Sequence, residues 1–325
     1  MSAYLAPPDS EFRALSARLG KDPLQVQGPG GNTSLKDGDV MWIKASGTEL
    51  AHAERQDIFV AVSRAVALAE THGSAGDGSC QAAVLDPHSK LRPSIETTFH
   101  AALDHTVVVH THSVATLTHA ISPEGRAAAR DKLGGLPFVM VPYAKPGLPL
   151  TNSIMSRVTA ETAVVVLQNH GLICCGSSAS EVSELLGEVE ERLAMPLRGA
   201  QYTPPEASPE SGMEWVSEGW MAQQPRTCTL AMSGSYYPDH VVFLGPGGLP
   251  ASGQEGAWPA NLSEGVGIAL RTDASSSQRA MLRCLSDVLG RLPEEWSASP
   301  IGPEAEAELL NWDAEKYRQA LASRP

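Results

Sequence analysis

Two histidines separated by one residue, His110 and His112, form the most specific chemical feature of the sequence. They follow the apolar run Val107-Val108-Val109, which favours a β-strand. Side chains at positions i and i+2 of a strand face the same side, so both imidazole rings could bind one cation. Two histidines with an ordinary structural role at a strand end are the alternative. The spacing therefore favours a metal site without requiring one.

Two further residues could complete such a site. His170 stands in Gln168-Asn169-His170-Gly171 after a second apolar run, and the glycine allows the backbone to turn sharply there; a plain turn histidine is the alternative. Glu96 stands near the start of an expected helix, where the helix dipole favours an acid whatever its function. Three imidazoles and one carboxylate suit Zn²⁺ or a similar divalent ion. A carboxylate that can leave the metal can also transfer protons.

The glycine-rich stretch 28–34, followed by Ser46-Gly47, indicates a site for an anion. Backbone N–H groups in such loops form concave donors, and asparagine and serine side chains add more. The stretch lacks the Gly-Lys-Ser/Thr ending of a Walker loop, and no GxGxxG lies between a strand and a helix. Residues 245–250 fail that pattern as well, because Pro250 stands where the last glycine belongs. A plain surface loop is the alternative.

Hydrophobic periodicity over the first 195 residues predicts the elements that must position these residues. Their spacing does not demand a parallel sheet, so antiparallel or mixed pairing stays open. The expected strands are 40–45, 106–112, 138–142, 163–168 and 172–175. The expected helices are 9–19, 56–70, a helix to about 103 with Ser94 as its N-cap, 113–121 and 178–195. His100 and His105 could support the site or have a structural role.

A change of composition separates this first α/β unit from the rest of the chain. Residues 203–212 are rich in proline, serine and glutamate, as linkers are. Beyond them we expect strands at 241–244 and 266–270 and helices at 276–292 and 303–322. A chain of 325 residues suits about two domains. We therefore expect a catalytic domain over 1–200, a linker over 201–213 and a smaller α/β extension over 214–325.

Charge and cysteine content restrict the partners and the compartment. The chain has 24 basic and 37 acidic residues, a formal charge of −13, which argues against nucleic acids and anionic membranes as partners. No apolar run approaches the roughly 18–20 residues of a membrane span, and no secretory signal is evident. The five cysteines are irregularly spaced and include no CxxC pair. We therefore expect the protein to reside in the reducing cytoplasm, and we expect any metal to be bound by histidine and carboxylate side chains.

Taken in order, several short segments resemble the class II aldolase/adducin family. The resemblance covers roughly residues 10–195 and is closer to the long rhamnulose-phosphate aldolase-like branch than to the short fuculose-phosphate type. It is carried by the segments GGNTS (30–34), IKASG (43–47), PSIE with FH (93–96 and 99–100), HTH (110–112), VPY (141–143) and QNHG (168–171).

The resemblance implies a fold and a role for each candidate residue. It implies a three-layer α/β fold with a central, mainly antiparallel sheet flanked by helices, and a homo-oligomer, commonly a tetramer. The metal ligands would be His110, His112 and His170. Glu96 would be the general acid/base and a fourth ligand at rest, and Tyr143 a proton donor. The phosphate site would comprise Asn32, Ser46, Gly47 and Ser94. Ile95 replaces a serine of the short branch, which removes one phosphate donor.

The implied activity is that of a metal-dependent aldehyde-lyase. It would cleave a ketose phosphate by retro-aldol chemistry through a metal-stabilised enediolate, with zinc or another divalent ion acting as a Lewis acid. A sugar-phosphate 4-epimerase, a decarboxylase of a sugar-acid phosphate and a dehydratase could use the same residues. A non-catalytic, adducin-like module is the alternative from another class of protein. No GxSxG motif supports a serine hydrolase.

Overall fold

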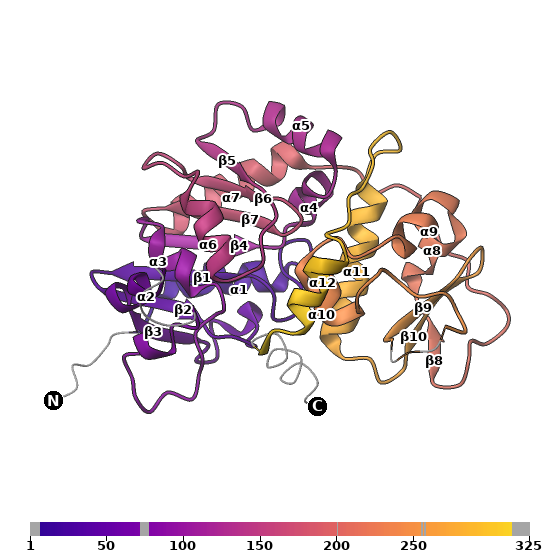
Figure 1. Ribbon diagram of the computed structural model, residues 1–325, viewed down its shortest axis with the longest axis horizontal. Coiled ribbons are helices and arrows are strands. Elements are labelled where there is room, and N and C mark those ends of the chain that lie inside the picture. The colour runs from indigo at the N-terminus through magenta and orange to yellow at the C-terminus, as the bar shows by residue number, and fades with distance from the viewer. Residues whose placement is uncertain (1–6, 72–77, 200, 255, 257, 314–325) are drawn as a thin grey trace. The chain divides into compact units, whose positions relative to one another are not determined.

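The chain divides into two units, seen in a computed structural model that describes residues 7–71, 78–199, 201–254, 256 and 258–313 (Figure 1). Unit 1 comprises the described residues of 1–113 and 133–192, and unit 2 those of 114–132 and 193–325. None of the helices in these described stretches is both long and apolar enough to cross a membrane.

The described residues of unit 1 form a seven-stranded sheet in the order β3-β2-β1-β4-β7-β6-β5. Every neighbouring pair is antiparallel except β5 and β6. The expected central, mainly antiparallel sheet is therefore confirmed. The strands are β1 (Asn32–Asp37), β2 (Val40–Lys44), β3 (Phe59–Ser63), β4 (Val107–Thr111), β5 (Phe138–Val141), β6 (Val164–Leu167) and β7 (Gly171–Gly176).

Helices cover both faces of this sheet, because alternate residues of each strand point to opposite sides. In β1, Ser34 contacts a residue of α3, whereas the hydroxyl of Thr33 lies 2.8 Å from that of Ser16 in α1. Helices α2 and α6 pack against α3. The side chain of Arg18 in α1 donates a hydrogen bond to the hydroxyl of Ser183 in α7. The helices of unit 1 are α1 (Ser10–Lys21), α2 (Arg64–Thr71), α3 (Thr97–Ala102), α6 (Leu148–Met155) and α7 (Ala179–Leu193), with short 3₁₀ turns at Leu50–His52 and Gln81–Ala83.

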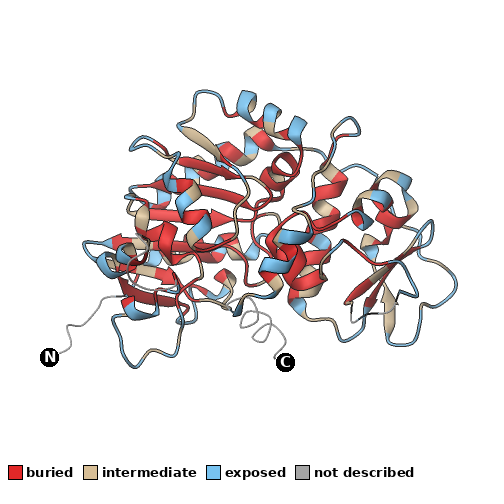
Figure 2. Ribbon diagram, viewed as in Figure 1, coloured by how far each residue is buried: buried red, intermediate tan, exposed pale blue. Residues whose placement is uncertain are grey.

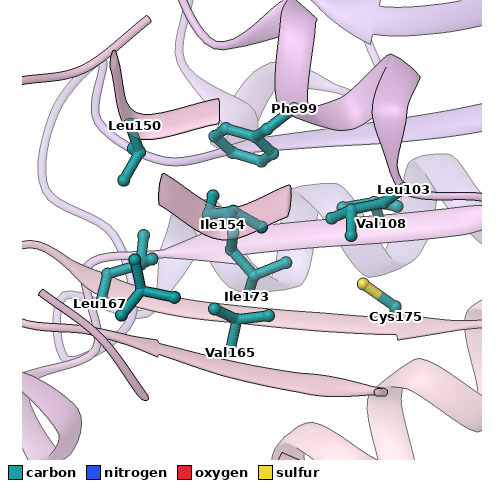
Figure 3. Packing of buried hydrophobic residues seen from close by; sticks show 10 residues of the cluster. Phe99, Leu103, Val108, Leu150, Ile154, Val165, Leu167, Ile173 and Cys175 are labelled. Atoms are coloured by element: carbon teal, nitrogen blue, oxygen red, sulfur yellow. The ribbon is translucent and has the colours of Figure 1, made fainter. Parts of the chain in front are cut away.

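A cluster of buried apolar side chains lies between the sheet and the helices α3 and α6, on the face of the sheet that carries the candidate site. Figure 2 shows the strands of this sheet largely as buried residues. Phe99 of α3 and Ile154 of α6 pack over Ile173 of β7 (Figure 3), and all three are fully buried. Burying each such side chain contributes about 1.5–3 kcal/mol. The cluster therefore anchors α3, the helix that follows Glu96, to the central strands.

Two predictions for unit 1 were wrong in type or extent, and one strand was not predicted. Residues 56–70 form β3 followed by α2 rather than one helix, because Phe59–Ser63 is buried on both faces and pairs with β2. Ser94 is not a helix N-cap, since α3 starts at Thr97 with Glu96 before it. Strand β1 was not predicted, because its sequence is mostly polar and follows the glycine-rich stretch. The remaining predicted strands of unit 1 are confirmed within about a residue or two at each end.

Unit 2 combines helices with a three-stranded antiparallel sheet, β8-β10-β9, among its described residues. The prediction of a strand at 241–244 was wrong: these residues end α10 (Pro238–Leu244), which Pro238 starts with its fixed backbone angle. The strand at 266–270 and the helix at 276–292 are confirmed, and Ser275 and Gln278 form a capping box at the start of that helix. Of the helix predicted at 303–322, residues 303–310 are helical, and those after 313 lie outside the described residues.

The elements of unit 2 come from two separate parts of the chain. They are α4 (Val114–Ala120), α5 (Pro123–Lys132), β8 (Met213–Trp215), α8 (Trp220–Gln223), α9 (Pro225–Met232), α10 (Pro238–Leu244), β9 (Ala260–Ser263), β10 (Gly267–Arg271), α11 (Ser276–Arg291) and α12 (Pro303–Leu310), with a 3₁₀ turn at Ser217–Gly219. Helix α11 packs against both α4 and α10.

Unit 2 is expected to lose stability in acid because of two buried histidines. Burial lowers the pKa of His240 to about 3 and is the main cause lowering that of His119 to about 4. The unfolded chain, in which a histidine has a pKa of about 6.5, binds more protons below that pH. The free energy of unfolding should therefore fall as the pH drops from 6.5 towards 4, by up to about 1.4 kcal/mol per pH unit for each histidine.

Urea unfolding followed by tryptophan fluorescence tests this prediction. Five of the six tryptophans lie in unit 2, so the signal reports mainly on that unit: Trp215, Trp220, Trp258, Trp296 and Trp312. The difference in stability between His240→Leu and the wild type should shift in favour of the variant as the pH falls from 7 to 4. A difference that does not change with pH contradicts the prediction.

Candidate metal centre

Three histidines meet at one end of strands β4 and β7. His110 is the fourth residue of β4, and His112 lies one residue beyond its end. His170 lies in the turn before β7, and the pairing of Thr111 with Leu172 brings that turn to the end of β4. The ring of His110 lies 5.0 Å from the ring of each of the other two, and those two are 5.5 Å apart. All three histidines are buried.

The turn that presents His170 depends on a close approach of two backbones. Strands β6 and β7 are joined by residues 168–170, and Asn169 adopts a left-handed conformation with φ of 53°. A Cβ atom at Gly171 would lie 2.3 Å from the carbonyl oxygen of Thr111 and 3.3 Å from the ring of His110. Only glycine fits here without moving the strand that carries two of the histidines.

The chemistry of the three histidines fits a divalent cation. Their ring nitrogens lie within 4.8 Å of one another, so one ion could contact all three. The Nδ1 of His110 is 3.0 Å from the carbonyl oxygen of Leu172, which can only accept a hydrogen bond. Nδ1 therefore carries the proton, and Nε2 is the nitrogen that can act as a ligand.

Glu96 supplies a buried carboxylate beside this cluster. Its two oxygens lie 3.5 Å from Nε2 of His110 and 3.4 Å from Nε2 of His170. Burial opposes ionisation of the carboxyl group, but the electrostatic effects of His110 and His170 and a hydrogen bond from Asn32 outweigh it, so the pKa of Glu96 is lowered. The side chain is thus suited to be a charged ligand or a proton acceptor.

Of the residues expected to bind phosphate, Asn32 and Ser94 lie directly against Glu96. The Nδ2 of Asn32 donates to Oε2 of Glu96 at 2.8 Å and to Oγ of Ser94 at 3.2 Å. The backbone N–H of Glu96 also donates to Oγ of Ser94, at 3.2 Å. The hydroxyl of Ser94 accepts both bonds, and its own proton can be donated elsewhere.

Ser46 and Gly47 lie in the turn after β2, beside the segment that leads to Ser94. Ala45 forms a β-bridge with Pro93, and the backbone N–H of Ser46 donates to the carbonyl of Arg92 at 2.9 Å. The hydroxyl of Ser46, rather than its amide, is therefore the group that can turn toward an anion. Gly47 has a φ of 76°, which glycine adopts without strain.

Tyr143 lies two residues after β5, at the edge of the sheet where the turn of His170 also lies. Strands β5 and β6 are parallel, so their carboxyl ends meet at that edge, and the N–H of Gln168 donates to the carbonyl of Val141 at 2.9 Å. The side chain of Tyr143 is half-buried. Its role as a proton donor stays a prediction.

Two residues without an assigned role, Ser34 and His100, line the back of the site. His100 is fully buried on α3 and lies between Ser34 and Asn32, with its Nδ1 2.7 Å from the hydroxyl of Ser34. The i, i+2 spacing of Asn32 and Ser34 would have pointed to a shared face if β1 had been predicted as a strand. Gln27, before the glycine-rich loop, also donates to the carbonyl of His112, at 3.5 Å.

The chain is similar to known proteins in sequence and in structure over part of its length. Residues 11–197 match the family described as "Class II Aldolase and Adducin N-terminal domain", a range that contains all the candidate residues. The N-terminal class II aldolase domain of a conserved protein from Thermoplasma acidophilum is similar in structure, with a TM-score of 0.50 and 26% sequence identity, covering 59% of this chain and 97% of that one.

Two curated proteins are similar in sequence over about half of the chain. One, from Bacillus subtilis strain 168, is named "Uncharacterized oxidoreductase YuxG"; it is 31% identical over 180 residues, which cover 50% of this chain and 25% of that protein. The other, from Methanocaldococcus jannaschii, is named L-fuculose phosphate aldolase; it is 24% identical over 189 residues, covering 54% of this chain and 88% of that protein. The match thus spans only a quarter of the Bacillus protein.

Proposed function

This chain belongs to the class II aldolase and adducin family, and on that premise we propose that it is a metal-dependent aldehyde-lyase that cleaves a ketose phosphate. One observation carries the proposal: three buried histidines with ligand atoms within 4.8 Å of one another lie against a buried carboxylate. A binding module with no use for a metal gains nothing from burying these polar groups together, since their burial costs stability. The arrangement therefore favours an enzyme over a non-catalytic module.

His110, His112 and His170 would hold zinc or another divalent ion, with Glu96 as a fourth ligand at rest. Such an ion supplies a Lewis acid that polarises a carbonyl oxygen and stabilises negative charge beside it. Glu96 would take up and return the proton on the reacting carbon, because it lies beside the histidines and its pKa favours the charged, proton-accepting form. Asn32 would keep this carboxylate in place through its 2.8 Å hydrogen bond.

The remaining candidate residues would contact the phosphate of the substrate and the oxygen that becomes the aldehyde. The hydroxyls of Ser94 and Ser46 and the turn at Gly47 would contact the phosphate, together with the amide of Asn32. Tyr143 would take up the proton of the hydroxyl that becomes the aldehyde oxygen as the carbon–carbon bond breaks, and it would donate that proton in the reverse, bond-forming direction. The substrate class is a sugar phosphate or a sugar acid, which agrees with the aldolase named among the relatives.

Replacing Glu96 by glutamine should lower kcat by roughly 10²- to 10⁴-fold, the usual contribution of a general acid or base. The amide keeps the shape of the side chain but cannot accept a proton. Zinc-loaded protein is screened against phosphorylated and free ketoses, beginning with L-fuculose 1-phosphate, and the formation of dihydroxyacetone phosphate or glycolaldehyde is followed.

Glu70→Gln is a matched control, because Glu70 is equally buried at 4% exposure and accepts hydrogen bonds from Gly78 and Cys80 instead. It should keep wild-type turnover. Full turnover by the Glu96 variant overturns its acid/base role. If the loaded enzyme converts a sugar phosphate without releasing dihydroxyacetone phosphate or glycolaldehyde, the reaction is instead epimerisation, decarboxylation or dehydration.

We also propose an organisation for the whole chain. Residues 1–200 would form the catalytic domain and 201–213 a linker, with 214–325 an extension that the family match does not reach. We propose a homo-oligomer in the cytoplasm, in keeping with the family and with five buried cysteines that are all free thiols. Size-exclusion chromatography with light scattering tests the oligomer.

A further inference from the structure

A chain of hydrogen-bonded side chains lies behind Glu96. We propose that Ser34 and His100 are positioning residues that fix which way the amide of Asn32 faces, and that they thereby hold Glu96 in place. The proposal rests on the proposed function in so far as Glu96 is the acid/base, but the order of the hydrogen bonds can be tested without turnover.

Ser34, His100, Asn32 and Glu96 of unit 1 are joined in that order by hydrogen bonds, and this chain is called the relay below. Asn32 and Ser34 share one face of β1, and α3 places the ring of His100 between them. The ring nitrogens contact Oγ of Ser34 at 2.7 Å and Oδ1 of Asn32. On its other side, the amide nitrogen of Asn32 lies 2.8 Å from Glu96. The ring is held flat against Phe99, with ring centres 4.5 Å apart.

The chemistry of the groups sets the direction of every bond. A carbonyl oxygen such as Oδ1 of Asn32 can only accept, so Nε2 of His100 must carry a proton. Burial, with Lys36 and His110 nearby, lowers the pKa of His100 well below its usual value, so the ring is neutral and carries only that proton. Nδ1 is therefore bare and accepts from the hydroxyl of Ser34.

This order matters because an asparagine amide can be placed in two ways that differ only by exchange of its oxygen and nitrogen. If the amide were reversed, its oxygen would face the carboxylate of Glu96, and two acceptors would oppose each other. The proton on Nε2 prevents this by requiring an acceptor on the side of His100. The buried hydroxyl of Ser34 has no other acceptor among the described residues, so it donates to Nδ1 and thereby keeps the ring proton on Nε2.

Nitrogen NMR of the full-length apoprotein, labelled with ¹⁵N-histidine, tests the relay directly. At pH 7 the wild type should show His100 with a proton on Nε2 and a bare Nδ1, assigned by loss of these signals in His100→Gln. In Ser34→Ala, both ring nitrogens should shift toward values averaged between the two tautomers. A wild-type ring with its proton on Nδ1, or no shift in Ser34→Ala, overturns the proposal.

Thr33→Val provides the matched control. Its hydroxyl is equally buried in the same strand, but it pairs with Ser16 on the opposite face. Loss of that hydroxyl should leave the His100 signals unchanged. If Thr33→Val shifts them as Ser34→Ala does, the effect is a general loosening of β1 and the relay is wrong.

Kinetics then separate positioning from structure. His100→Leu should lower kcat roughly 10- to 100-fold, as loss of a supporting partner usually does, with KM and zinc affinity nearly unchanged. His100→Gln, which can still donate to Asn32, should recover part of the loss. Equal kcat in both variants argues against the relay. If the wild type cleaves no ketose phosphate, the proposed function fails, and the NMR result still decides the relay.

Discussion

Replacing Gly171 by alanine is expected to weaken zinc binding by more than about 100-fold, although no ligand is removed. Loss of a residue that only supports a ligand usually costs 10- to 100-fold in metal affinity. Here the new methyl group would lie 2.3 Å from the carbonyl oxygen of Thr111 and 3.3 Å from the ring of His110. Because that oxygen belongs to the backbone of β4, the strand itself must move, and His110 and His112 move with it.

Isothermal titration of zinc into the apoprotein, with urea unfolding in parallel, measures both consequences. Gly187→Ala is the matched control, because a Cβ there meets nothing within 4 Å and Gly187 lies inside helix α7. That change should leave zinc affinity intact and stabilise the helix by about 0.5–1 kcal/mol. Wild-type zinc affinity in Gly171→Ala would show that the close approach of the turn to β4 is unimportant.

Removal of a ligand itself is expected to have a comparably large effect. His110→Ala should abolish stoichiometric zinc binding, because this ring lies 5.0 Å from each of the other two and contacts Glu96 at 3.5 Å. Zinc usually takes four ligands, and this change leaves only two histidines and one carboxylate of the proposed four. The metal content of purified protein, measured by atomic emission, and zinc titration of the apoprotein provide the readout.

His105→Ala serves as the control for this experiment. His105 comes just before β4 and is only half-buried, and the bond that holds Lys36 uses its backbone carbonyl, which the change retains. It should bind one zinc ion per chain, as the wild type does. If His110→Ala also keeps one tightly bound ion, the metal centre lies elsewhere.

The cluster of three histidines could be anticipated from sequence because its members follow apolar strands at defined spacings. The i, i+2 rule predicts that His110 and His112 face one side, and their rings lie 5.0 Å apart. That His170 joins them depends on the pairing of β4 with β7, which spacing alone does not determine. The family's ordered motifs supplied that information.

The polar support of the site could not be anticipated in the same way. Strand β1 has the sequence NTSLKD, which lacks the apolar alternation of a typical strand, since its inward side chains Asn32 and Ser34 are hydrogen-bonded to Glu96 and His100. The prediction of a single helix over residues 56–70 failed for the opposite reason. Ile58, Val62 and Ala65 fit a helical spacing, but the run Phe59–Ser63 is a strand that is buried on both faces. In both cases tertiary contacts outweighed the local pattern.

The composition of unit 2 has a consequence for how the chain is made. Helix α4 starts two residues after His112 and is almost entirely buried, with α11 packed against it and Trp296 against its His119. These partners are synthesised more than 150 residues after α4. At roughly 5–20 residues per second, the apolar side of α4 waits on the order of ten seconds or more on the ribosome before it can be covered. Residues 193–325 therefore complete a structure that the chain begins much earlier, and a version shortened at residue 200 would leave exposed the side of α4 that α11 covers.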